Sequence, residues 1–158
     1  MDSKVKIYLD RAENESVLAE IIYKISEDKK EKERFIIDEN MTFYSAVIGH
    51  SYYSIFYCTK ALLLTEDVET KSPEIHRKTY DEFKKIFVDS GKLDIELLKI
   101  YKKMLMRADE LLGLFKQEKW KRGHFTYKTI SQANMRPAKE SVKNAKKFIK
   151  HIRLLLKK

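Results

Sequence analysis

The stretch from Gly49 to Leu64 carries apolar side chains on every side of a helix with 3.6 residues per turn. They form three faces: Tyr53, Tyr57 and Leu64; Tyr52, Phe56 and Leu63; and Ile55, Cys58 and Leu62. Because a surface helix shows a single apolar stripe, this pattern predicts a central helix with neighbours on most sides. Polar residues interrupt the run, so it is too polar to cross a bilayer: His50, Ser51, Ser54, Thr59 and Lys60.

Four other segments also have helical periodicity, so the chain is predicted to form about five helices. We expect them over about residues 4–28, 40–65, 73–89, 94–119 and 134–156. The first has an apolar face formed by Leu9, Ala12, Ala19 and Ile22 and widened by Ile21 and Ile25. The last has a stripe formed by Ala138, Val142, Ala145, Ile149, Ile152 and Leu156, with lysines on the rest of its surface.

Capping residues predict where these helices begin and end. Asn40 is a candidate N-cap of the central helix. Ser72 followed by Pro73 is typical of a helix start, and Gly91 of a helix end. We expect the charged run 27–34 to be a solvated helix end or a loop, and residues 120–133 to be a loop or an irregular helix end.

The length of 158 residues, with only four Gly and two Pro, favours one all-α domain over residues 1–158. The single cysteine, Cys58, lies in the apolar helix, so we expect a core residue rather than a nucleophile. A lone cysteine also fits a reducing compartment. The sequence shows no export or membrane segment, and we expect a cytoplasmic protein with no membrane partner.

The basic residues are concentrated towards the C-terminus. Residues 115–158 contain 14 Lys or Arg against Glu118 and Glu140, a net charge of +12, whereas residues 1–114 contain 19 basic and 22 acidic residues, a net charge of −3. This asymmetry indicates a polyanionic partner, which could be nucleic acid, nucleotide phosphates, an anionic lipid surface or an acidic protein. The alternative is a lysine-rich helix face that is merely solvated.

Signatures of metal and cofactor chemistry are missing from the sequence. It has no glycine-rich phosphate loop, no HExxH and no pair of cysteines, and its four histidines, at positions 50, 76, 124 and 151, are scattered. We therefore expect neither a metal nor a cofactor. His50 is interpreted as a satisfied core histidine and His151 as a solvated one.

The stretch RGHFTY, residues 122–127, is the main candidate for chemistry. Arg122 can hold a phosphate through two hydrogen bonds, His124 titrates near neutral pH, and Tyr127 can stack on a base. A plain surface loop is the alternative. The tyrosines of the central helix, including Tyr52 and Tyr53, either pack in the core or direct their hydroxyls to a pocket or a subunit interface.

The sequence SYYSIFYCTKALL, residues 51–63, resembles the A/S-Y-Y-A-x-F…K-A-L signature of HEPN-domain proteins (higher eukaryotes and prokaryotes nucleotide-binding). The similarity is to the small, stand-alone prokaryotic type that is associated with minimal nucleotidyltransferases. Later landmarks follow in the family's order: His76 and Phe83, FVDSGKLD at 87–94, Arg122 and Tyr127, and the closing pattern of Ala138, Ala145 and Phe148. The resemblance covers about residues 40–156.

This resemblance implies an antiparallel, up-and-down helical bundle that usually forms a homodimer. It also implies RNA or a nucleotide as the ligand and a nucleotidyltransferase antitoxin as a partner, and many relatives are ribonucleases or toxins. The positions that match the family's motifs, together with the adjacent loop, give the ligand-binding candidates Arg122, His124, Tyr127, Tyr52, Tyr53 and Lys60.

The sequence departs from the family's catalytic motif, in which a His follows an Arg by four to six residues. His124 follows Arg122 too soon, and Tyr127 holds the expected position of the His. Cleavage of RNA needs an acid or base at that place. We therefore expect a HEPN-like module, one half of a toxin–antitoxin pair, that binds RNA, a nucleotide or a nucleotidyltransferase. The alternatives are a metal-independent ribonuclease toxin that uses Arg122, His124 and Tyr127, and a purely structural interaction module.

Overall fold

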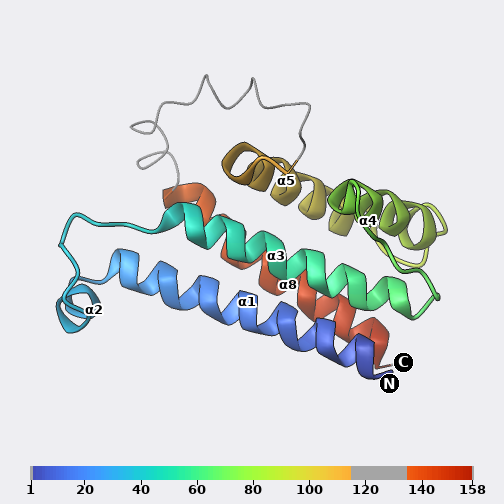
Figure 1. Cartoon of the computed structure of the whole chain (residues 1–158), viewed down its shortest axis with the longest axis horizontal. Coiled ribbons are helices and arrows are strands. Elements are labelled where there is room, and N and C mark those ends of the chain that lie inside the picture. Colours follow the sequence, from blue (N-terminus) through green and yellow to red (C-terminus); the bar gives the residue numbers. More distant parts are fainter. Residues whose placement is uncertain (1, 115–134, 158) are drawn as a thin grey trace.

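The computed structural model describes residues 2–114 and 135–157. In these residues the chain forms helices and no strand: α1 (Ser3–Glu27), α2 (Lys29–Arg34), α3 (Tyr44–Leu64), α4 (Ile75–Phe83), the π-helix η1 (Lys84–Val88), α5 (Ile95–Leu112) and α8 (Met135–Leu156). The long helices α1, α3, α5 and α8 alternate in direction (Figure 1). The predicted all-α, up-and-down bundle is confirmed.

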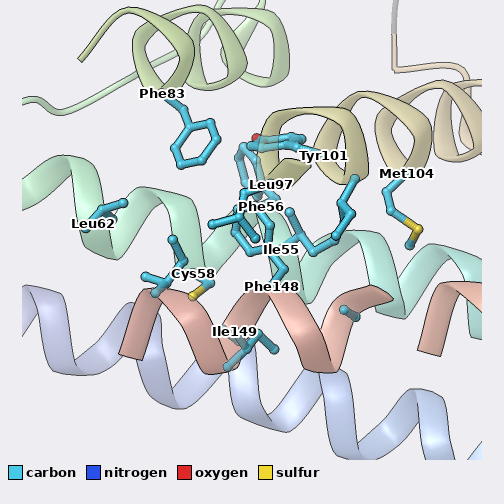
Figure 2. Close-up of a cluster of buried hydrophobic side chains, with 14 of the residues drawn as sticks. Ile55, Phe56, Cys58, Leu62, Phe83, Leu97, Tyr101, Met104, Phe148 and Ile149 are labelled. Carbon is cyan, nitrogen blue, oxygen red and sulfur yellow. The ribbon is translucent and has the colours of Figure 1, made fainter. Parts of the chain in front are cut away.

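The central helix of the bundle is α3, as its apolar pattern predicted. It contacts α1, α4, α5 and α8, and most of its residues are buried. Side chains from three other helices converge on it, among them Phe83 of α4, Tyr101 of α5 and Phe148 of α8 (Figure 2). The ring of Phe83 lies 5.6 Å from those of both Tyr101 and Phe148. The aromatic side chains of the bundle therefore join α3, α4, α5 and α8 in one core.

The start of α3 differs from its prediction. The helix begins at Tyr44 with Phe43 as its N-cap residue, so the prediction of Asn40 as N-cap is wrong. The N–H of Asn40 instead donates to a carboxylate oxygen of Asp38 at 2.8 Å, and the N–H of Phe43 donates to the Ser26 hydroxyl of α1 at 2.9 Å. These contacts hold the segment before α3 in a non-helical path along the end of α1.

The start of α4 also differs from its prediction. The helix begins at Ile75 with Glu74 as its N-cap residue, after Ser72 and Pro73, which were expected to start it. The preceding segment is tied to the core, because the Lys60 amino group donates to the Thr70 carbonyl at 3.1 Å and the Thr70 and Thr79 hydroxyls share a hydrogen bond of 2.7 Å. The helical path ends in η1, before Gly91, close to where the sequence predicted.

The predicted fourth helix is shorter than expected. It was predicted to reach about residue 119, but α5 ends at Leu112. Gly113 adopts a left-handed conformation with φ of 60°, and its N–H donates to the Asp109 carbonyl at 2.8 Å. Glycine is the residue that most readily adopts this conformation, so Gly113 ends the helix as a C-cap.

Two expectations for the N-terminal region need correction. Ile21 was expected to widen the buried face of α1, but its side chain is 49% exposed. In the charged run 27–34, which was expected to be a helix end or a loop, Glu27 ends α1 and residues 29–34 form a separate short helix, α2, whose N-cap residue Asp28 accepts from the Lys30 N–H. Lys32 of α2 is buried and donates to the Glu39 carbonyl, which holds the following loop against the helix.

Candidate nucleic-acid interface

Helix α8 has an apolar face and a basic face. The apolar face is buried in the bundle and consists of Ala138, Ser141, Ala145, Phe148, Ile149 and Ile152. The basic residues are Arg136, Lys139, Lys143, Lys146, Lys147, Lys150 and Arg153, with Lys157 just after the helix end. At about 100° per residue they fall within an arc of roughly 120°. We call this set of eight residues the basic face.

Acidic residues of α1 neutralise part of the basic face. Lys146 forms an ion pair with Glu20 at 2.8 Å, and Arg153 forms one with Glu13. These pairs join α8 to α1 along the edge where the two helices meet. They are partly exposed, so each contributes little to stability. Their main effect is to remove two positive charges from that edge.

The single acidic residue of α8, Glu140, forms ion pairs with two residues of α5. Its carboxylate accepts from Arg107 at 2.8 Å and from Lys103. Hydrogen bonds from Lys103 and Arg107 lower the pKa of Glu140 to about 2, so it is ionised at neutral pH and matched by two cations. Glu140 therefore does not offset the charge of the basic face.

Within residues 2–114 and 135–157, the other six basic-face residues have no ion pair. All six are exposed, and four of them, Lys139, Lys143, Lys147 and Lys150, follow one another along the middle of the helix. With a rise of about 1.5 Å per residue, they cover roughly 16 Å. A single nucleic-acid strand places a phosphate every few ångströms. This row of lysines can therefore meet several phosphates of one strand at the same time.

A groove runs beside the basic face, between α1 and α8, with a volume of about 360 Å³. Its apolar lining includes Val17, Ile149 and Leu154, and Lys150 and Lys157 are among its charged residues. Val17 and Leu154 are 50% and 55% exposed. Glu13 and Glu20 also line the groove, where they are paired with Arg153 and Lys146. The groove therefore offers aliphatic surface beside cations.

Tyr52 and Tyr53, two of the predicted ligand-binding residues, lie in an aromatic cluster with Phe56 and His76. The Tyr52 hydroxyl and His76 Nδ1 are 2.7 Å apart, and the His76 ring lies 4.5 Å from that of Phe56. Burial raises the pKa of Tyr52, and burial followed by the charge of Lys60 lowers the pKa of His76. The pair is therefore neutral at neutral pH. Tyr52 is fully buried and Tyr53 is half-buried.

Lys60, the third predicted residue of α3, is buried beside the same cluster. Its amino group donates to the Thr70 carbonyl and lies 5.0 Å from the ring centroid of Tyr8 and 5.9 Å from that of Phe56. Tyr52, Tyr53 and Lys60 therefore all lie close to the Phe56 ring, inside the bundle. The lysines of the basic face, in contrast, are exposed. A role of the three α3 residues in ligand binding stays a prediction.

The other three predicted residues, Arg122, His124 and Tyr127, lie outside the described residues. Among the described ones, no group of three or more His, Cys, Asp or Glu could hold a metal ion. Within the same residues, no helix combines the length and apolar character of a membrane span.

The prediction of Cys58 as a core residue is confirmed, because it is fully buried and burial raises the pKa of its thiol to about 12.

One polar pair was missed by sequence reasoning. His50 Nδ1 of α3 lies 2.6 Å from a carboxylate oxygen of Glu15 on α1. The His50 side chain is about one-third exposed and that of Glu15 about one-quarter. His50 was interpreted as a satisfied core histidine, and Glu15 was not identified as its partner. The two residues are 35 positions apart, so no motif of local spacing could have revealed them.

Comparisons with known proteins give one partial similarity. Over 58 residues the chain is 41% identical to a protein of Methanocaldococcus jannaschii that is named "Putative toxin MJ0142". The aligned region is 37% of this chain and 37% of that protein, so the chain spans little more than a third of its relative. No protein-family model matches the chain. No solved structure gives a significant match. The chain is therefore similar, in part, to a protein named as a toxin.

Proposed function

We propose that this chain is a HEPN-like, toxin-type protein of the cytoplasm that binds RNA through the basic face of α8. The observation that carries the proposal is the row of exposed lysines, Lys139, Lys143, Lys147 and Lys150, with no ion pair in the described part of the chain. Cations in such a row gain affinity for a phosphate backbone by releasing its condensed counterions. The groove between α1 and α8 adds aliphatic surface beside these cations, against which a base can pack.

The toxin part of the proposal is supported by the partial similarity to the M. jannaschii protein and by the resemblance of residues 40–156 to HEPN domains. As one half of a toxin–antitoxin pair, the chain has a minimal nucleotidyltransferase as its antitoxin. Arg122, His124 and Tyr127 add contacts to RNA. The proposal is binding rather than efficient cleavage, because Tyr127 holds the position where the family's catalytic members have a His.

The chain acts as a homodimer in this proposal, in keeping with the resemblance. Light scattering at micromolar protein should then return twice the chain mass of 18.8 kDa. A mass of one chain at that concentration would remove the homodimer from the proposal. It would leave the RNA-binding surface of each chain unaffected.

A set of substitutions tests the RNA-binding surface. The triple variant Lys143→Ala, Lys147→Ala and Lys150→Ala removes three exposed cations from the basic face. Alanine suits an exposed helix position, so the variant should fold. Affinity for a labelled single-stranded RNA, measured by fluorescence anisotropy at low salt, should fall by about tenfold or more.

The matched control removes three exposed lysines elsewhere, Lys30 on α2, Lys85 on η1 and Lys102 on α5, which are exposed like the lysines of the basic face. The control loses the same total charge but keeps the basic face intact. It should therefore retain most of the affinity of the wild type. Equal losses in the two triple variants would mean that net charge, rather than the basic face, attracts the RNA.

A further inference from the structure

A second cavity lies away from the basic face, between the first half of α3 and the last turn of α5. Its volume is about 410 Å³, within the range of small-molecule sites in proteins. The lining residues that matter are Ala46, Gly49, His50, Tyr53, Glu110 and Leu112. The end of α5 lies alongside this part of α3 (Figure 1). The cavity is therefore formed by two rigid helices of the bundle.

The polar groups of this cavity include the Glu110 carboxylate, the His50 ring and the Tyr53 hydroxyl. A carboxylate oxygen of Glu15 lies 2.6 Å from His50 Nδ1 and can only accept, so this contact uses one nitrogen of the ring and fixes its position at the cavity wall. Glu110 is exposed and has no ion pair within the residues that the structure describes. Burial, and then the charges of Tyr57 and Glu15, raise the pKa of Tyr53, which keeps its hydroxyl protonated. The Glu110 carboxylate, which can only accept, suits a ligand that donates hydrogen bonds.

The charges near the cavity favour a cation. Glu110 supplies a negative charge, while the carboxylate of Glu15, behind His50, is paired with the His50 ring. The C-terminal end of α5 adds the negative end of its helix dipole, about half a charge. The first turn of α3 has the opposite partial charge at the edge near Ser45. The Glu110 carboxylate and the end of α5 outweigh that half charge, so the cavity favours a cation over a phosphate.

The walls of the cavity are largely apolar. A Cβ atom at Gly49 would lie 3.7 Å from Leu112 Cδ1, so the missing side chain leaves the α3 backbone open to the cavity opposite Leu112. Ala46 is equally small, and the Tyr53 ring forms another wall. A flat or branched apolar group can occupy this space while its charged end reaches the carboxylate.

We propose that this cavity binds a small organic cation, a protonated primary amine on an aromatic or branched apolar body. The ammonium group donates to the Glu110 carboxylate beside the His50 ring, and the apolar body lies between Leu112, Tyr53 and the small residues of α3. The site is independent of the proposed RNA-binding surface, because it uses α3 and α5 and has the opposite charge.

Phenethylamine is a suitable probe, with 3-phenylpropionate as a ligand of the same shape and opposite charge. In the full chain labelled with ¹⁵N, phenethylamine should shift the imidazole signals of His50 in a saturable manner at millimolar concentration, and 3-phenylpropionate should not. Failure of the amine to bind saturably, or equal binding of the acid, would overturn the proposal.

The variant Glu110→Gln keeps the shape of the side chain and removes its charge. It should weaken phenethylamine binding by about tenfold, the value of a charge-assisted hydrogen bond. The control Glu96→Gln removes an exposed carboxylate from the opposite end of α5 and should bind as the wild type does. Unchanged binding by Glu110→Gln would overturn the assignment. RNA affinity should not change in either variant, which separates this test from that of the basic face.

Discussion

Replacing Phe56 by Ala tests the core around α3. Phe56 is 4% exposed, and its ring lies 6.2 Å from that of Tyr52 and 4.5 Å from that of His76. Removing a buried Phe side chain costs about 3–5 kcal/mol in the free energy of unfolding, from lost transfer energy and the cavity left behind. Lys60, 5.9 Å from the same ring, would also lose a cation–π contact. We therefore expect the upper half of that range.

The assay is urea unfolding followed by far-ultraviolet circular dichroism, with thermal unfolding in parallel. For a chain of this length, about 3–5 kcal/mol corresponds to a fall in Tm of about 8–15 °C. The urea m-value should stay the same if the folded state keeps its shape. Phe35→Ala is the control, since Phe35 is 54% exposed and its loss should change stability by no more than about 0.5 kcal/mol. A loss below about 1 kcal/mol in Phe56→Ala would refute the tightly packed core.

Two further predictions concern titratable groups. The folded-state pKa of Glu140 is about 2, below its unfolded value, so its ion pairs stabilise the protein above the unfolded pKa and this contribution disappears as the pH falls towards 2. In urea melts, Glu140→Gln should thus have a lower free energy of unfolding than the wild type at about pH 6, and the difference between the two proteins should be smaller at about pH 3. A difference that is the same at both pH values would contradict this. Cys58 should not react with a thiol reagent in the native protein at about pH 8 and should react fully after unfolding, because burial raises the pKa of its thiol to about 12. Rapid labelling of the native protein would show that the helix opens.

The arrangement of the helices could be predicted because it depends on patterns within each segment. The apolar residues on three faces of residues 49–64 predicted the central position of α3, and the stripe of α8 correctly placed Ala138, Ala145, Ile149 and Ile152 in the core. Burial of apolar surface dominates the choice of face, so a periodic pattern is sufficient for this level of the structure.

The ends of the helices and the polar contacts could not be predicted in the same way. The start of α3 depends on Ser26, and that of α4 on the contact between Thr70 and Thr79, all set by tertiary packing. The end of α5 is the exception. Gly113 is a local signal for a helix end, but the prediction followed the apolar periodicity of the segment beyond it.

The charge of the last helix was predicted from composition, but its neutralisation was not. Glu13 and Glu20 lie more than a hundred residues before their partners on α8, and only the packing of α1 against α8 shows that Arg153 and Lys146 are paired. Within the described residues, Lys139, Lys143, Lys147 and Lys150 form a row of exposed cations without an ion pair. For residues 135–157 the structure therefore places the excess of charge on one face of α8.

The salt dependence of RNA binding tests the proposed function most directly. Contact of four lysines with a single strand predicts a slope of about −3 in a plot of log affinity against log salt concentration, since each neutralised phosphate contributes about −0.7. The affinity of the wild type should then fall at least about fiftyfold from about 50 to about 200 mM salt. The triple variant of Lys143, Lys147 and Lys150 should show a slope less steep by about 2, the share of its three removed lysines, so its affinity should fall about twentyfold less over the same range. A wild-type slope near zero, or the same slope in the triple variant, would contradict RNA binding by the basic face of α8.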